Sequence, residues 1–201
     1  MTETFNGLPV YQLEMMPEGD GLEAIALVDI PAIKKNFQRF HEKMTFAINE
    51  ERRIVSGPVM IPDKLMFRDD KERGQYYVFF TKQMIEQINM KYFASGNIHS
   101  VNLMHDPNTA VKDIVMFESF LSDSSRGVLP MSGFDDCPEG TWFASFKVNN
   151  DAVWEMVKAE DFRGFSVEGV FNHQPVKEDI TEEDVEALER MYAVFEKIIA
   201  K

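Results

Sequence analysis

Hydrophobic positions along the chain fall into two periods, which predict a mixture of strands and helices. Short apolar runs bounded by Gly, Pro, Asn, Asp or Ser are typical of β-strands. Such runs occupy residues 8–11, 24–28, 54–61, 75–80, 101–104, 114–121, 141–148 and 165–171. We expect the runs at 54–61 and 75–80 to pair as antiparallel strands, and the run at 114–121 to form a buried strand.

Two internal helices are predicted from caps and from apolar residues at helical spacing. Thr81 is the expected N-cap of the first helix, and Gly96 stands at its expected end. The apolar stripe between them consists of Met84, Ile85, Ile88 and Tyr92. Asn150 is the expected cap of a shorter helix that runs through residues 153–157. The pattern therefore predicts an α+β chain.

A further helix is predicted at the C-terminus. Thr181 followed by Asp184 resembles a capping box, with Asp in place of Glu or Gln. The apolar positions from Val185 to Ile199 then follow the alternating spacing of a coiled-coil seam. Packing on its own domain is favoured over a coiled coil. The chain thus divides into an N-terminal arm or strands at 1–45, a central domain at 46–178 and a C-terminal helix at 179–201.

Composition excludes several classes of protein. The 201 residues include 34 acidic and 21 basic side chains, for a formal charge of −13, and this charge disfavours direct binding to nucleic acid. The single cysteine, Cys137, excludes an internal disulfide framework. Residues 1–5 lack the features of a secretory signal, and no apolar run approaches the roughly 18 residues of a membrane span. We expect a soluble, unexported protein with no membrane partner.

A serine and a histidine provide the candidate chemistry. Ser166 lies within an apolar, strand-like run between two glycines, and His105 ends another short apolar run. A serine hydroxyl becomes a nucleophile when a positioned base removes its proton, and histidine is the usual base near neutral pH. Taken together, the two segments predict a serine hydrolase site. Each residue has a structural alternative, since Ser166 could bond to neighbouring backbone and His105 could cap a turn.

The remaining members of such a site are less sharply indicated. Glu118 is the candidate third catalytic residue, because a carboxylate in an apolar run needs a partner to offset its desolvation; a salt bridge or a solvent-exposed edge position explains it equally well. Asp106 is the weaker choice, since neighbours on a strand point to opposite faces. His173 would lie more than ~20 Å from Ser166 on one extended strand. For the oxyanion hole, the candidates are Arg163 and the backbone near Gly164.

Metal chemistry is the main alternative to a serine nucleophile. Four potential N and O ligands, His99, His105, Asp106 and Asp113, are close in sequence. Their spacing matches no strong zinc motif, and the chain has no phosphate-binding loop. We therefore expect neither a metal nor another cofactor.

Two hexapeptides, VNLMHD at 101–106 and GFSVEG at 164–169, resemble the prohead, or capsid maturation, proteases of tailed phages. The resemblance extends more weakly over about residues 22–172 and is distantly shared with herpesvirus assemblins. It implies a small, mostly antiparallel β-barrel surrounded by helices, with Ser166 as nucleophile and His105 as base. The related viral enzymes use a second histidine as the third catalytic residue, and this chain departs from that pattern. Glu118 is therefore proposed from its own sequence surroundings and not from the resemblance.

The resemblance also implies a biological role. A serine endopeptidase of this family would cleave scaffold and major capsid proteins inside an assembling procapsid in the host cytoplasm, and could process itself. Self-association into a homo-oligomer is left open. The alternative is a protease-like domain that has lost catalysis and serves as a structural or scaffold-binding head protein.

Overall fold

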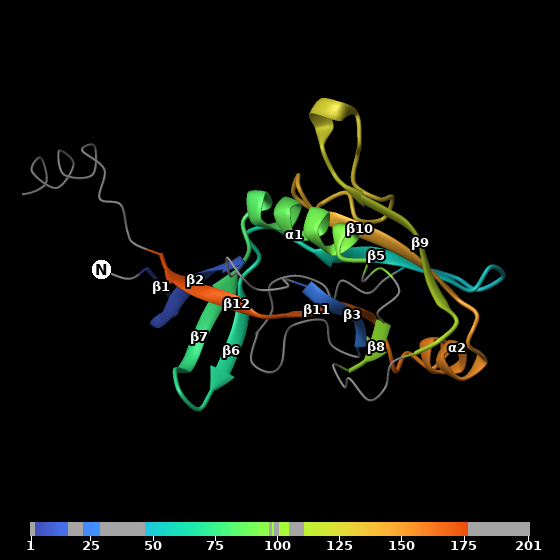
Figure 1. Cartoon of the computed structure of the whole chain (residues 1–201), viewed down its shortest axis with the longest axis horizontal. Helices are drawn as coiled ribbons and strands as arrows, with labels where there is room; N and C mark the ends of the chain where they lie inside the picture. Colours follow the sequence, from blue (N-terminus) through green and yellow to red (C-terminus); the bar gives the residue numbers. More distant parts are fainter. Residues whose placement is uncertain are drawn as a thin grey trace, which may run out of the picture.

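The computed structural model describes residues 3–15, 22–28, 47–96, 98, 101–104 and 111–176. These residues form a strand-rich α/β fold with two α-helices, α1 (Lys82–Ala94) and α2 (Asp151–Lys158) (Figure 1). Neither helix has the length and apolar character needed to cross a bilayer. The predicted mixture of strands and helices is confirmed, and the predicted helix at 179–201 lies outside the described residues.

The strands are divided among three sheets. The first contains β1 (Thr4–Phe5), β2 (Leu8–Met15), β7 (Gly74–Phe79), β6 (Met66–Asp70) and β12 (Phe171–Pro175). The second contains β4 (Ala47–Asn49), β5 (Ile54–Met60), β10 (Trp142–Val148) and β9 (Ile114–Leu121). The third contains β11 (Gly164–Gly169), β3 (Leu22–Val28) and β8 (Val101–Leu103). Strands from the predicted N-terminal segment, β2 and β3, therefore pair with strands from later in the chain.

The barrel implied by the resemblance is not confirmed. Most strand pairs are antiparallel, the exceptions being β2 with β7 and β3 with β8, but no sheet closes on itself within the described part of the chain. Closure requires a continuous ring of paired strands. Here the predicted strand at 165–171 divides at Val170 into β11 and β12, which join different sheets.

The expected pairing of runs 54–61 and 75–80 is wrong. β5 pairs with β4 and β10, whereas β7 pairs with β2 and β6. The sequence of β6 includes Arg68, Asp69 and Asp70. The strand was therefore not predicted, because it lacks the apolar run by which the other strands were identified. It nevertheless forms a hairpin with β7 through a three-residue connection at 71–73, and the proximity of the two strands in sequence favours this pairing.

The expectation of a buried strand at 114–121 is also wrong. β9 forms as predicted, but it lies at the edge of its sheet, and Val115, Phe117 and Glu118 are exposed. The register with β10 shifts between Met116 and Glu118, so that Phe117 is an extra residue in a β-bulge. An edge strand packs on one neighbour only, which is why an apolar sequence does not guarantee burial here.

Both internal helices begin at their predicted caps. The Thr81 side chain accepts a hydrogen bond from the Met84 N–H at 3.2 Å, and the Asn150 side chain accepts one from the Val153 N–H at 3.1 Å. Gly96, just beyond α1, has φ +77°, a conformation that glycine adopts without steric cost. Local sequence alone therefore determines where these helices begin and where α1 ends.

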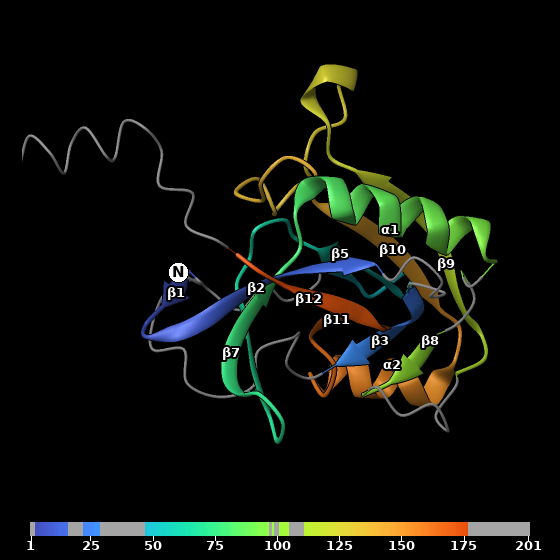
Figure 2. The same ribbon diagram turned by 60° about the vertical axis from the view of Figure 1, so that its left-hand side comes forward.

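A single large core joins the three sheets. Phe146 on β10 is fully buried, and its ring centroid lies 4.9 Å from that of Phe165 on β11. On the same face of β10, Tyr92 of α1 packs edge-on to Trp142 at 5.5 Å, and Figure 2 shows this helix running over β10. The Phe146–Phe165 contact thus connects the second sheet to the third.

Loss of the Phe146 ring should strongly destabilise the fold. Phe146→Ala removes a fully buried aromatic side chain, and we expect the free energy of unfolding to fall by roughly 3–5 kcal/mol. Urea denaturation followed by tryptophan fluorescence measures this change. The matched control is Phe117→Ala on the neighbouring strand, where half the side chain is exposed. Similar losses in both variants would contradict the assigned core.

Candidate functional site

Ser166 lies on β11, an outer strand of the three-stranded sheet whose order is β11–β3–β8. On β11 it pairs with Ala26 of β3, and on the other side of β3 Ala26 pairs with Asn102 of β8. Adjacent strands are roughly 4.8 Å apart, so Ser166 and Asn102 are separated by about 10 Å across the sheet. Ser166 is 7% exposed. The two hexapeptides singled out in the sequence therefore contribute strands to one small sheet.

The predicted base follows the end of β8. The Met104 N–H donates to the Leu27 carbonyl at 3.0 Å, and Met104, just after β8, has φ +55°. His105 itself lies outside the described residues, as do His99 and Asp106. The pairing of Ser166 with His105 stays a prediction.

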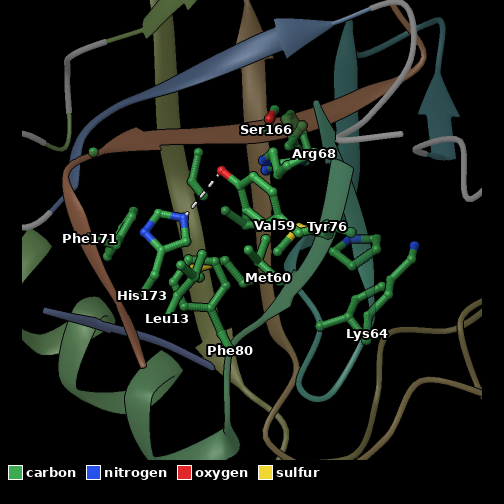
Figure 3. Close-up of a pocket in the computed structure, with 17 residues that line it drawn as sticks. Leu13, Val59, Met60, Lys64, Arg68, Tyr76, Phe80, Ser166, Phe171 and His173 are labelled. Atoms are coloured by element: carbon green, nitrogen blue, oxygen red, sulfur yellow. Dashed lines mark hydrogen bonds between the residues drawn. The ribbon is translucent and has the colours of Figure 1, made fainter. Parts of the chain in front are cut away.

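Ser166 lines a cavity of about 280 Å³. The cavity lies where the three sheets meet, because its walls come from β5 of the second sheet, from β11 of the third and from four strands of the first. Most of the wall is apolar. Figure 3 shows the polar exceptions, Lys64, Arg68, Tyr76 and His173, in the wall together with Ser166. Residues from distant parts of the sequence thus surround the candidate nucleophile.

Three of the polar groups near the cavity form a hydrogen-bonded chain. The Tyr76 hydroxyl donates to Asp70 Oδ2 at 2.5 Å, and the Tyr76 oxygen lies 3.5 Å from His173 Nε2 (Figure 3). Because the phenol proton is directed to Asp70, the Tyr76 oxygen is available to accept a hydrogen bond from the Nε2–H group of His173. This arrangement favours the His173 tautomer that carries its hydrogen on Nε2.

The environment of His173 favours the neutral form of its imidazole, because it lowers the pKa. Burial lowers the pKa of His173 below its ordinary value of 6.5, and the positive charges of Arg73 and Arg68 lower it further, against an opposing effect of Asp70. The unfolded chain therefore binds a proton at this position more readily than the native protein. Consequently, this group makes the free energy of unfolding decrease as the pH falls from about 6.5 through the lower native pKa.

On a single extended strand, His173 would lie far from Ser166. The structure places both residues on the wall of one cavity, since the chain passes from β11 to β12 at Val170 and enters another sheet. Alternating residues of the β6–β7 hairpin, Arg68 and Tyr76 among them, also line the cavity. Because alternate residues of a strand face the same side, this alternation in the sequence is the signal that could have identified the hairpin as one wall of a cavity.

The predicted oxyanion residues lie outside the set that lines the cavity. Arg163 Nε donates to the Glu160 carbonyl at 3.0 Å, and its guanidinium forms an ion pair with the Glu160 carboxylate at 3.3 Å. Gly164 is buried at the start of β11, where it pairs with Val28. The cations that do line the cavity are Lys64 and Arg68. The oxyanion assignment stays a prediction.

Glu118 has a defined partner on the neighbouring strands. Its carboxylate accepts a hydrogen bond from the Ser145 hydroxyl at 2.6 Å, and Ser145 in turn accepts one from Ser56 at 2.8 Å. The residue is exposed, so the buried carboxylate expected from the sequence is wrong, and the edge-position alternative describes its setting. It is absent from the described lining of the Ser166 cavity.

The described residues contain no candidate metal site. Among them, no group of three or more His, Cys, Asp or Glu side chains is arranged to hold an ion. Of the four candidate ligands, only Asp113 is in this part of the chain. The expectation of a metal-free protein stays a prediction.

Comparison with known proteins identifies the family. The model of the Peptidase_S78_2 family, described as "Putative phage serine protease XkdF", matches residues 42–174, about two thirds of the chain. The chain belongs to this family. The match covers β4 to β12, including both Ser166 and His105. Searches of curated proteins and of solved structures returned no match. Membership in the XkdF family supports the resemblance to phage serine proteases; the more distant relation to assemblins is not shown.

Removal of the charge on Arg73 should raise the pKa of His173. In Arg73→Gln the backbone N–H that bonds Asp70 is kept, while the cation that disfavours the imidazolium is lost. We expect the His173 titration, followed by NMR of the imidazole and assigned with His173→Gln, to shift upward toward 6.5. The exposed neighbour variant Lys71→Gln serves as control. An unchanged or lower pKa in Arg73→Gln would refute the charge assignment.

Proposed function

We propose that this chain is a serine endopeptidase that cleaves scaffold and major capsid proteins during assembly of a phage procapsid. The observation that carries the proposal is that Ser166, the serine singled out by its sequence motif, lines a mostly apolar cavity at the junction of three sheets. The family match supports peptidase chemistry of the serine type. A cavity beside the nucleophile is what a peptidase needs to hold a substrate side chain next to the scissile bond.

In the proposed mechanism, His105 removes the proton of Ser166 while Oγ attacks the peptide carbonyl. The tetrahedral intermediate collapses as His105 delivers this proton to the leaving amine, and an acyl-enzyme ester remains. Water then attacks the ester, again with His105 as base, and releases the acid product and the free serine. Backbone N–H groups near Gly164 and the Arg163 side chain are the proposed oxyanion donors.

Glu118 keeps its predicted role of orienting His105. A residue that acts behind the base has no need to line the substrate cavity. The bond from Ser145 holds its carboxylate in a fixed position at the edge of the second sheet, which supports a positioning role.

Several finer features complete the proposal. The enzyme acts in the host cytoplasm, inside the procapsid, without a cofactor, and processes itself as well as its partners. The distant relation to assemblins and the helix at 179–201, which would dock on helical scaffold or on a second copy, belong to the same proposal. The non-catalytic head protein remains the competing outcome of the experiments below.

Replacement of Ser166 should abolish proteolysis. Wild-type protein and the Ser166→Ala and His105→Ala variants are incubated with scaffold and capsid proteins from the same genome, and intact masses are recorded. We expect discrete fragments with wild type only, because either change removes the nucleophile or its base. The exposed serine variant Ser125→Ala should cleave normally. Intact partners in every sample would favour a structural role, and cleavage by either active-site variant would remove that residue from the mechanism.

Replacement of Glu118 by Gln should lower kcat more than it changes KM. The amide keeps the size of the side chain but removes the charge that would orient and stabilise a protonated His105. Steady-state cleavage of a peptide identified by the mass experiment measures both constants. Glu155→Gln on the surface of α2 is the matched control. A kcat equal to that of wild type would rule out Glu118 as the positioning residue.

A further inference from the structure

The cavity beside Ser166 has an apolar surface that is drawn from all three sheets. Its wall includes Val59 and Met60 of β5, Val78 of β7 and Phe165 of β11. The same wall also contains polar side chains. The kind of occupant that the cavity favours therefore depends on whether these polar groups already have partners within the protein.

The polar groups of Tyr76 and His173 in this wall are engaged. The Tyr76 hydroxyl donates to Asp70 Oδ2 at 2.5 Å, and its oxygen lies 3.5 Å from His173 Nε2. Asp70 Oδ1 accepts hydrogen bonds from the N–H groups of Glu72 and Arg73 at 2.9 and 2.7 Å, and Asp70 is absent from the described lining of the cavity. The phenol and the imidazole are therefore held by the protein itself and need no polar group from a ligand.

Arg68 and Lys64, the two cations of the described wall, also interact with the protein. Arg68 Nη1 donates to the Phe67 carbonyl at 3.0 Å. Burial lowers the pKa of Lys64, and its ammonium group interacts electrostatically with Cys137, which lies outside the described lining. Figure 3 shows the ammonium end of Lys64 pointing away from His173. A charged ligand would have to compete with these contacts, whereas an apolar ligand would leave them intact.

The volume of the cavity suits one large apolar side chain. It is about 280 Å³, and an apolar cavity of roughly 150 Å³ is enough to hold a benzene ring. Phe80 and Phe171 form part of the wall, with ring centroids 4.9 Å apart in an edge-on arrangement. Met60 and Met66 lie in it as well, and their unbranched thioether side chains adapt to apolar groups of different shape. Leucine, methionine and phenylalanine side chains all meet these conditions.

The position of Ser166 decides which residue of a substrate enters the cavity. Its neighbours on β11, Phe165 and Val167, line the cavity together with it. A side chain that fills the cavity therefore belongs to a residue next to the bond that Ser166 attacks.

We propose that this cavity is the subsite for a large apolar side chain of the substrate, leucine, methionine or phenylalanine, next to the scissile bond. The inference rests on the peptidase function proposed above and assigns a substrate class to it. Transfer of an apolar side chain from water to an apolar wall is favourable in proportion to the area buried, and this transfer is the physical source of the selectivity. Cleavage sites in scaffold and capsid proteins should therefore contain a large apolar residue at one fixed position.

Binding to an inactive enzyme tests the subsite separately from catalysis. Fluorescent octapeptides with Leu, Phe, Asn or Glu at one position, in a background of Gly and Ser, are titrated onto full-length Ser166→Ala protein. Asn is the matched comparison, because it has nearly the shape of Leu but carries an amide whose burial without a partner costs free energy. We expect the Leu peptide to bind at least roughly tenfold more tightly than the Asn peptide, which corresponds to about 1.4 kcal/mol. Affinities that do not differ, or a preference for Asn or Glu, would overturn the inference.

Cleavage of the same peptides by the wild-type enzyme then tests the proposed function. If the Leu peptide binds the Ser166→Ala protein selectively but the wild type cleaves none of the peptides, the peptidase proposal fails and the apolar site stands. If the wild type cleaves the Asn and Leu peptides with equal kcat/KM, the subsite fails and the peptidase stands. The two failures are therefore distinguishable.

Variants of the wall test where the selected side chain lies. Met66→Ala enlarges the cavity, and we expect it to raise the Phe-to-Leu ratio of kcat/KM roughly tenfold, as a change of about one methylene group in an apolar pocket can do. Val59→Phe fills the cavity and should lower the Leu-to-Asn ratio toward one. Leu129→Ala, which removes an exposed apolar side chain outside the described lining, should keep both ratios. Thermal unfolding confirms that each variant is folded, and Met66→Ala alone is sufficient if Val59→Phe is not. Unchanged ratios in folded Met66→Ala would overturn the assignment.

Discussion

The contact between Phe146 and Phe165 supports the whole arrangement around Ser166. It joins β10, an inner strand of the second sheet, to β11, the strand that carries the serine. Ser166 follows Phe165 directly, so the position of its hydroxyl depends on a ring that is locked in the core. Rigid placement of a catalytic group by a buried neighbour is the ordinary way in which a core contributes to chemistry.

The sequence predicted local features well and long-range partners poorly. Thr81 and Asn150 cap their helices as expected, because a cap depends on residues three positions apart. Strand pairing depends on residues far apart in the chain, and the expected pair of β5 and β7 was wrong. The edge position of β9, and with it the exposure of Glu118, likewise follows from which strands are left without a second neighbour.

The candidate site shows the same division. Ser166 was selected from its motif, and the structure places it in the wall of a cavity, while its catalytic role stays a prediction. The remaining wall could not be found in this way, since Lys64, Arg68, Tyr76 and His173 come from a hairpin region and a strand whose positions depend on the sheet order. The sequence predicts one strand over 165–171 that would carry His173 far from Ser166, but the chain divides at Val170 into β11 and β12, which pair with different strands.

The meeting of three sheets at one cavity has a thermodynamic consequence. A ligand that fills the cavity contacts strands of all three sheets. These contacts are lost when the protein unfolds, so a bound ligand stabilises the native arrangement of the sheets. Any such ligand that binds only the native state raises the free energy of unfolding by RT ln(1 + [L]/Kd). Under the proposed function, substrate crowded around the enzyme during assembly would itself protect the fold, and this protection would end as the last cleavage sites are consumed.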